Sequence, residues 1–315
     1  MTKAVLWTAQ DAQTATGGTT TGDWTVSGIS IDSRKVTRGD LFIALKGPNF
    51  DGHTFAQAAL DAGASAVMVD DATGITDPDK ILLVDDTMAA LNRLGDAGRA
   101  RSNAKIVAIT GSVGKTGTKE ALKYVLSQQG KTHASPASFN NHWGVPISLA
   151  TLPVDAQYGV LEIGMNHPGE IGPLVKMVKP SVAMITTVVG AHTEYFKDEA
   201  EIAMAKAEIF DGLDKDGAVI LNRDNLHYFA LARRAKELGL TDIKSFGTDA
   251  VANYRLFEAN IVNDGSAVRS PFWAVSRPLV RTSNGLPAIW PMLPRLRAGA
   301  KHPRSNCPRV TAPLP

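Results

Sequence analysis

Short apolar runs alternate with amphipathic stretches along most of the chain, and the alternation falls into two series. In the first series, apolar runs predict strands at residues 25–31, 40–45, 66–69 and 81–84. Residues 53–62 have helical spacing and end at Gly63, while residues 87–101 predict a second helix with Thr87 as its N-cap. Residues 1–103 are therefore predicted to form a small N-terminal α/β domain.

The second series begins at Lys105. Residues 106–109 predict a buried strand, residues 110–116 a glycine-bearing loop and residues 117–129 a helix. Further strands are predicted at residues 159–163, 182–187 and 218–221, and further helices at residues 170–178, 199–210 and 226–238. Strands that alternate with helices indicate a doubly wound, mostly parallel sheet. The pattern thus predicts an α/β fold whose second domain, of the P-loop type, covers residues 104–268.

The composition is that of a globular protein. The chain has 315 residues, enough for two domains of about 150 residues each, with 44% hydrophobic and 20% charged residues. Cys307 is the single cysteine, so no intrachain disulfide can form. No apolar run approaches the ~20 residues of a membrane-spanning helix, and residues 1–11 lack the apolar segment of a secretory leader. We therefore expect a cytoplasmic protein.

Charge and proline content change sharply near the end of the sequence. From Gly265 to Pro315 there are seven arginines, one lysine and no acidic residue, so this segment carries +8 and the preceding residues carry −6. The same segment holds nine of the 17 prolines. Residues 269–315 are therefore predicted to form a disordered tail rich in Pro and Arg. Because its charges are dispersed among Pro, Trp and Leu, we expect no nucleic-acid partner.

The loop of the second series carries the first candidate chemistry. It consists of Thr110, Gly111, Ser112, Val113, Gly114, Lys115 and Thr116. Glycines let the backbone point its N–H groups at phosphate oxygens, and the following helix adds about half a positive charge at its N-terminus. Lys115 is predicted to reach the β- and γ-phosphates and the Thr116 hydroxyl to bind Mg²⁺. An ordinary strand-to-helix turn is the alternative, since Ile109 stands where the full P-loop pattern has glycine.

Longer motifs narrow the interpretation. They are DSRKVTRGDLFIALKGPNFDGHTFAQAALDAGA (32–64), TGSVGKTGTKEAL (110–122), SFNNHWGVP (138–146), EIGMNHPGEI (162–171), AHTEYF (191–196), IAMAKAEIF (202–210) and LNRDN (221–225). On these motifs the chain resembles the Mur ligases, and among them the branch that adds D-alanyl-D-alanine to UDP-N-acetylmuramoyl-tripeptide. The phosphate loop of that family has the short TGxxGKT form, which accounts for Ile109.

The resemblance implies ATP-dependent amide ligation in peptidoglycan precursor synthesis, and so a part in cell-wall formation, cell shape and cell division. ATP would phosphorylate the terminal carboxylate of the tripeptide to an acyl phosphate, and the amine of D-alanyl-D-alanine would then displace phosphate. Such catalysis depends on placing and neutralising anionic oxygens. The implied cofactors are ATP and Mg²⁺, and the implied partners are the two substrates, without a membrane partner. A monomer is expected.

The resemblance also implies which side chains do the chemistry, namely Lys115, Glu162, His192 and Lys206. Thr116, Glu162 and His192 are implied ligands of Mg²⁺, joined by Lys206 in its carbamylated form. Glu162 ends an apolar strand, which is where α/β folds place ligand groups. A buried lysine with a lowered pKa can react with CO₂.

Several assignments keep a simpler alternative. Lys206 would instead be a surface lysine paired with Glu201 or Glu208. Asn141 is implied to contact the nucleotide, although asparagine is common in turns. The implied substrate-binding residues are Ser33, Arg34 and Asn140, with Arg34 suited to a diphosphate.

The resemblance ends near Val268. The Mur branch continues into a third, Rossmann-like domain that is not recognisable here, so the central domain is expected to be incomplete and ligation lost or very slow. Because residues 289–292, read from the third base of each codon, can encode a string typical of that missing domain, we hypothesise a frame-shifted tail. Two other interpretations stay open: a non-catalytic nucleotide-binding protein with a basic interaction tail, and another ligase of the same superfamily, such as a folate-polyglutamate type.

Overall fold

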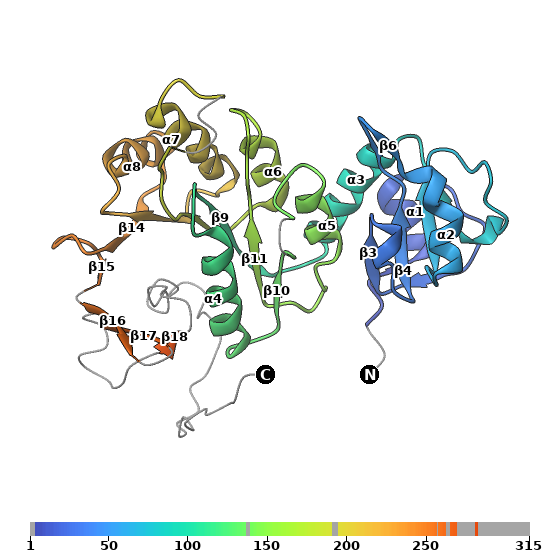
Figure 1. Ribbon diagram of the computed structural model, residues 1–315, viewed down its shortest axis with the longest axis horizontal. Helices are drawn as coiled ribbons and strands as arrows, with labels where there is room; N and C mark the ends of the chain where they lie inside the picture. Colours follow the sequence, from blue (N-terminus) through green and yellow to red (C-terminus); the bar gives the residue numbers. More distant parts are fainter. Residues whose placement is uncertain are drawn as a thin grey trace.

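The computed structural model describes residues 4–136, 139–190, 195–256, 258–262, 265–269 and 281–282. Two separate parallel sheets dominate it. Helix α3 (Thr87–Ala100) connects the N-terminal sheet, on the right in Figure 1, to the larger central sheet. Within the described ranges, no helix combines the length and the apolar character needed to cross a bilayer.

The N-terminal sheet has four parallel strands in the order β3-β4-β7-β8. They are β3 (Gly28–Ser30), β4 (Asp40–Ile43), β7 (Ala66–Val69) and β8 (Ile81–Leu83). Successive residues of a strand enter opposite cores: Leu41 packs with α1 (Ala9–Thr16) and α3, whereas Phe42 packs with α2 (Ala56–Asp61). This alternation is the period of two that a strand imposes on its side chains. The predicted small α/β unit is confirmed.

One predicted strand and one predicted cap need correction. Residues 25–31 form two strands, because β2 (Thr25–Val26) pairs with β1 (Trp7–Thr8) while β3 joins the parallel sheet. The N-cap of α3 is Asp86, whose Oδ1 accepts a hydrogen bond from the amide of Ala89 at 2.6 Å. Thr87, predicted as the cap, is instead the first helical residue and is buried.

The predicted helix at residues 53–62 and its terminal glycine agree more closely with the structure. The helix at residues 53–62 begins as a 3₁₀ turn (Gly52–Phe55) and continues as α2. Gly63 follows with a φ of 106°, the left-handed conformation expected just after a helix. A small hairpin of β5 (Lys46–Gly47) and β6 (Phe50–Asp51) precedes that helix.

The central sheet has seven parallel strands in the order β10-β11-β9-β12-β13-β14-β15, which confirms the predicted doubly wound topology. The strands are β9 (Lys105–Thr110), β10 (Thr132–Ala134), β11 (Tyr158–Glu162), β12 (Val182–Ile185), β13 (Ala218–Asn222), β14 (Asp242–Gly247) and β15 (Tyr254–Arg255). The chain first builds the sheet on one side of β9 and then on the other. Ligands of such sheets bind at this switch point, beyond the carboxyl ends of the strands.

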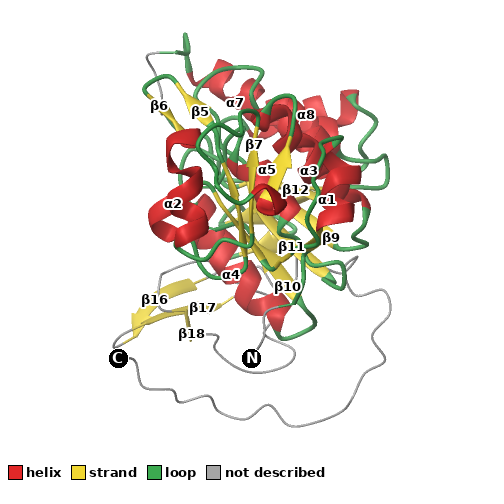
Figure 2. Ribbon diagram, turned by 90° about the vertical axis from the view of Figure 1, so that its right-hand side faces the viewer, coloured by secondary structure: helices red, strands yellow, loops and turns green. Residues whose placement is uncertain are grey.

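Helices cover the two faces of the central sheet unequally. They are α4 (Lys115–Ser127), α5 (Gly144–Ala150), α6 (Ile171–Val178), α7 (Glu199–Ala207) and α8 (Tyr228–Glu237). In Figures 1 and 2, α4 lies on the face opposite to α6, α7 and α8. On β9, Ile106 and Ala108 enter the core beneath α6–α8, while Val107 and Ile109 pack with α4.

The two sheets meet through a shared core near α5. Ile147 and Ala150 of α5 belong to the same buried cluster as Leu91 and Leu94 of α3. The indole Nε1 of Trp7 donates to the Ala150 carbonyl at 2.8 Å. The N-terminal segment is therefore anchored directly on the central part.

The last described segments form a three-stranded antiparallel sheet. It consists of β16 (Glu258–Val262), β17 (Gly265–Arg269) and β18 (Arg281–Thr282). Apart from Arg269 and β18, the predicted tail at residues 269–315 lies outside the described residues.

Candidate active site

The loop between β9 and α4 is held in a conformation that requires glycine. Gly111 has a φ of 151° and Gly114 a φ of 85°. A Cβ atom on Gly111 would lie 1.9 Å from Oγ1 of Thr186, which itself donates to the Val113 carbonyl at 2.6 Å. Thr186 therefore packs against the loop so closely that no side chain fits at position 111.

Ser112 fixes the same loop to the segment after β12. Its amide donates to the Thr187 carbonyl at 2.9 Å, and its hydroxyl donates to the Val189 carbonyl at 2.8 Å. The same hydroxyl accepts from the Val189 amide at 3.1 Å. The Ser112 side chain is thus used to hold the loop in place.

This loop opens onto a cavity of about 460 Å³ at the carboxyl ends of β9 and β11. The lining residues are Ser112, Val113, Gly114, Lys115, Thr116, Gly117, Asn140 and Glu162. Because α4 begins at Lys115, the N–H groups of its first turn have no partner within the helix. The cavity therefore lies where an anion is favoured.

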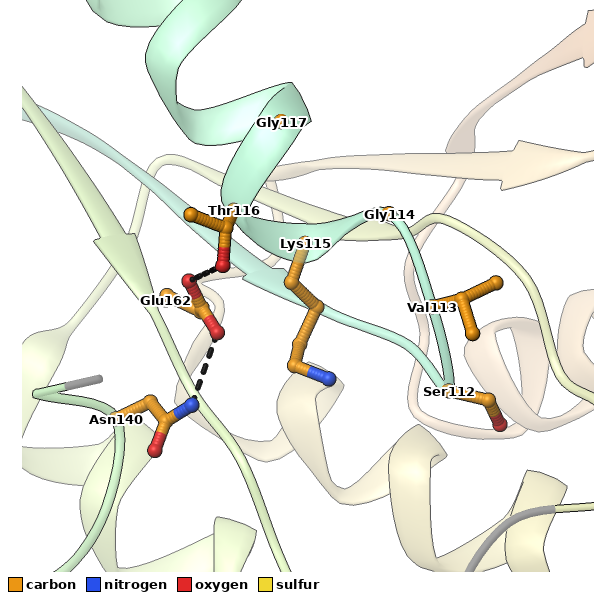
Figure 3. A pocket seen from close by; sticks show the side chains of 8 residues that line it. All are labelled: Ser112, Val113, Gly114, Lys115, Thr116, Gly117, Asn140 and Glu162. Atoms are coloured by element: carbon orange, nitrogen blue, oxygen red, sulfur yellow. Dashed lines mark hydrogen bonds between the residues drawn. The ribbon is translucent and has the colours of Figure 1, made fainter. Parts of the chain in front are cut away.

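Glu162, on β11, lines one side of the cavity, between Thr116 and Asn140 (Figure 3). One carboxylate oxygen accepts from the Thr116 hydroxyl at 3.0 Å and the other from Nδ2 of Asn140 at 2.9 Å. The residue is only 4% exposed. Two side chains, one from α4 and one from the segment after β10, therefore converge on the carboxylate that β11 provides.

Lys115 extends into the same space (Figure 3). Its ammonium donates to the Gly111 carbonyl at 2.6 Å. Burial lowers the pKa of Lys115, and the charge of Glu162 partly opposes that shift. The lysine is therefore kept folded against its own loop, within reach of an incoming anion.

Lys206 is a buried lysine on α7, with 3% exposure. Burial lowers its pKa to about 8, and the positive charge of Lys115 acts in the same direction. Glu201 accepts from the Lys197 amide at 2.7 Å and Glu208 accepts from the Gly169 amide at 2.7 Å. The two predicted surface partners are therefore engaged elsewhere, and Lys206 is not a surface lysine.

Other predicted site residues are placed less centrally. Thr110 is buried beneath the loop, and its Oγ1 has no hydrogen-bond partner among the described residues. Asn141 lies next to the cavity-lining Asn140, but its Oδ1 accepts from the Gly144 amide at 2.9 Å at the start of α5. His192 lies outside the described residues.

The predicted substrate residues Ser33 and Arg34 lie in the N-terminal part, in a 3₁₀ turn (Ser33–Lys35) after β3. Arg34 is paired with Asp32 through two hydrogen bonds, from Nε at 2.8 Å and from Nη2 at 2.9 Å. This pairing holds the pKa of the Asp32 carboxyl at about 2. A ligand of Arg34 would have to replace that ion pair.

Three structural contributors were not predicted from the sequence. Thr186 and Ser135 are buried, and Lys119 is completely buried. Ser135 accepts a hydrogen bond from the Glu162 amide at 3.2 Å, and Lys119 donates to the Ser135 carbonyl at 2.9 Å. Lys119 was visible in the GKTGTKEAL motif only as one more charged residue of a helix.

The donor set suits a magnesium ion. The Thr116 hydroxyl and the Glu162 carboxylate supply oxygen ligands, which Mg²⁺ prefers, and the ion usually keeps several waters. Among the described residues there is no cluster of three or more His, Cys, Asp and Glu side chains. Such a cluster is not required by the predicted ligands, which include a hydroxyl and a modified lysine.

Comparison with known proteins identifies the family to which this chain belongs. The family model described as "Mur ligase middle domain" matches residues 109–278, more than half of the chain, and "Mur ligase family, catalytic domain" matches residues 25–99. The chain belongs to the Mur ligase family. The middle-domain match runs past Val268, where the resemblance was expected to end.

Individual relatives agree with this assignment. A Rickettsia prowazekii protein named UDP-N-acetylmuramoyl-tripeptide–D-alanyl-D-alanine ligase is 42% identical over 252 residues, covering 80% of this chain and 56% of that protein. A crystal structure of MurF from Acinetobacter baumannii is 32% identical with a TM-score of 0.74, over 89% of this chain and 61% of that one. MurF from Thermotoga maritima in complex with ADP is 28% identical with a TM-score of 0.62, over 77% and 55%. The chain thus spans little more than half the length of these relatives.

Proposed function

We propose that this Mur ligase chain binds ATP with Mg²⁺ in the cavity above the loop at residues 110–116. The observation that carries the proposal is the convergence of Thr116 and Asn140 on the buried carboxylate of Glu162, beside Lys115. Mg²⁺ would be held by Thr116 and Glu162, where it would neutralise charge on the phosphates. The ADP complex of the Thermotoga maritima relative supports a nucleotide ligand.

The reaction we propose is the one that the relatives' names state, the joining of D-alanyl-D-alanine to UDP-N-acetylmuramoyl-tripeptide in peptidoglycan precursor synthesis. Lys115 would stabilise phosphate oxygens, and Asn140 and Glu162 would keep the site in register with the phosphate loop. Lys206, buried and with a lowered pKa, is suited to carbamylation and thereby to a second metal contact. His192 keeps its predicted metal role as part of the proposal.

The remaining assignments also belong to this proposal. Ser33 and Arg34 would contact the uridine nucleotide in the N-terminal part. A cytoplasmic location and a monomeric state are the corresponding predictions for the whole protein. Of the alternatives, the names of the relatives favour the D-alanyl-D-alanine ligase over another ligase of the superfamily.

Nucleotide binding is tested by calorimetry of the purified chain with ADP, in MgCl₂ and in EDTA. We expect affinity that increases with Mg²⁺ and that falls about 10- to 100-fold in Lys115→Ala, since a charge-assisted hydrogen bond to phosphate is lost. Lys123→Ala, on the exposed side of the same helix, is the matched control. Unchanged affinity in Lys115→Ala would contradict the proposal.

Ligation is tested separately by phosphate release. Since ligation by this chain is expected to be lost or very slow, any signal should be weak, and it should require UDP-N-acetylmuramoyl-tripeptide, D-alanyl-D-alanine and ATP together. Phosphate release that depends on neither UDP-N-acetylmuramoyl-tripeptide nor D-alanyl-D-alanine would identify a different reaction at the same nucleotide site.

A further inference from the structure

Lys119 is a charged residue that the proposed function does not use, and its side chain is completely buried. It lies one helical turn after Lys115 on α4, so the two lysines share one face of the helix. Burying an ammonium group is unfavourable unless hydrogen bonds compensate it. The partners of Lys119 therefore indicate what its charge does.

Among the described residues, the ammonium of Lys119 has neighbours of two different kinds. It donates to the Ser135 carbonyl at 2.9 Å, and it lies 3.2 Å from Oε1 of Glu120. The Glu120 side chain is 56% exposed, whereas Ser135 is 2% exposed. The buried end of the interaction is therefore the one to Ser135.

Ser135 connects three elements that build the cavity. It follows β10 directly, and its amide donates to the Val160 carbonyl of β11 at 3.1 Å. Its hydroxyl accepts from the Glu162 amide at 3.2 Å. With the bond from Lys119, the polar groups of Ser135 are tied to α4 and to β11 at once.

We propose that Lys119 is a positioning residue for the magnesium–nucleotide site. It holds Ser135, and through Ser135 the backbone of Glu162, at a fixed place relative to α4, which carries Thr116. The same bond anchors the start of the segment that leads to Asn140. This inference rests on the proposed function.

The geometry around Glu162 explains why such an anchor matters. The carboxylate must stay within 3.0 Å of Thr116 on α4 and 2.9 Å of Asn140 on a separate segment. Hydrogen bonds of this kind weaken steeply when donor and acceptor move apart or out of line. A bond from α4 to the residue that holds the Glu162 amide keeps both contacts in register.

The test is the Mg²⁺ dependence of nucleotide affinity, measured with ADP in MgCl₂ and in EDTA. Lys119→Met keeps the apolar stem and removes the ammonium. We expect it to lower the affinity in MgCl₂ by about tenfold, as loss of groups that orient metal ligands does, with the affinity in EDTA changed by no more than about twofold. Lys123→Met is the matched control, because Lys123 also pairs with Glu120 but is half exposed, and no change is expected there.

A merely structural role would lower the melting temperature of Lys119→Met without changing the ratio of the two affinities, and that result would overturn the inference. Ser135→Ala, which removes only the hydroxyl that holds the Glu162 amide, is expected to show the same selective loss. If Lys119→Met does not fold, the ratio of the two affinities in Ser135→Ala tests the inference instead. Absence of any Mg²⁺ dependence in the unmodified chain would refute the proposed function itself, a result distinct from an unchanged ratio in the variants.

Discussion

The phosphate loop at residues 110–116 and the turn at residues 32–34 follow parallel strands in the two sheets, yet they are built in opposite ways. The loop is braced from outside, because Thr186 and the segment after β12 hold it through Val113 and Ser112. The turn is held by a local ion pair, because Nε and Nη2 of Arg34 bond to Asp32 two residues earlier and the Arg34 side chain is 86% exposed.

This difference separates a prebuilt site from one that a ligand must rearrange. In the phosphate loop the backbone is fixed before any ligand arrives, so little conformational entropy remains to be lost on binding. In the turn, a ligand has to replace an exposed ion pair whose net contribution is small. Substitutions in the loop should therefore have large effects on binding and substitutions in the turn small ones.

The largest effect is expected for Gly111→Ala. The added Cβ would lie 1.9 Å from Thr186 Oγ1, so the loop must move away from its brace. Each charge-assisted hydrogen bond from the loop to phosphate contributes about 1.5–3 kcal/mol, so losing two of them should lower the ADP affinity measured by calorimetry by on the order of 100-fold or more. Gly74→Ala is the control, since Gly74 also has a positive φ, of 82°, but has open space around it. Equal losses in both variants would contradict the role of the brace.

Glu162→Gln should have the next largest effect. The substitution keeps the volume of the buried side chain but removes its charge, so the Mg²⁺-dependent part of ADP affinity should fall by about 10- to 100-fold. Affinity in EDTA should stay nearly constant. Glu237→Gln, an exposed carboxylate on α8, is the control. A parallel loss with and without Mg²⁺ would indicate a structural role for Glu162 instead.

Much of the architecture follows from local pattern, and the exceptions have identifiable causes. The strands β7 and β11 are contiguous apolar runs, buried on both faces, and the sequence predicts them closely. Strand β10 has only three half-buried residues, and α5 is buried all round, so neither shows a helical or strand period.

The candidate site divides in the same way. The loop, Lys115, Thr116 and Glu162 were predicted from motifs, and the structure brings them together. The role of Thr186 could not be predicted from motifs, because Thr186 contacts Val113 across 73 positions of the chain and belongs to no recognisable local pattern. The frame-shift hypothesis for residues 269–315 stays a prediction that sequencing of the gene would test.

Lys206→Met is expected to have a moderate effect, and unlike the substitutions above it should be favourable, because it should stabilise the folded state. Burial of the ammonium lowers the pKa of Lys206 to about 8, so the native state binds fewer protons than the unfolded state between about pH 8 and pH 10.5. Below pH 8 both states carry the charge, and the native state is destabilised by burying it. In CO₂-free buffer at pH 7 we expect the variant to unfold with a free energy about 1–3 kcal/mol higher than the unmodified chain.

The pH dependence checks the cause. As pH rises from 8 to 10.5, the unmodified chain gains stability relative to Lys206→Met. The difference between their free energies of unfolding, measured with urea, should therefore narrow. Adding ¹³C-bicarbonate should then give a carbamate signal in the NMR spectrum of the unmodified chain alone. A difference that stays constant across this pH range would show that Lys206 is not a buried ammonium in solution.

The smallest effect is expected for Arg34→Ala. ADP affinity should not change, because Arg34 belongs to a turn beside the N-terminal sheet and is not one of the residues that line the phosphate cavity. Affinity for uridine diphosphate should fall by only about fivefold, since the guanidinium that binds the ligand must first leave Asp32. Lys35→Ala, which neighbours Arg34 but lies 3.9 Å from Asp32, is the control. Unchanged uridine diphosphate affinity in Arg34→Ala would remove Arg34 from the substrate site, whereas a loss as large as that of Gly111→Ala would mean that the turn is as firmly prebuilt as the loop.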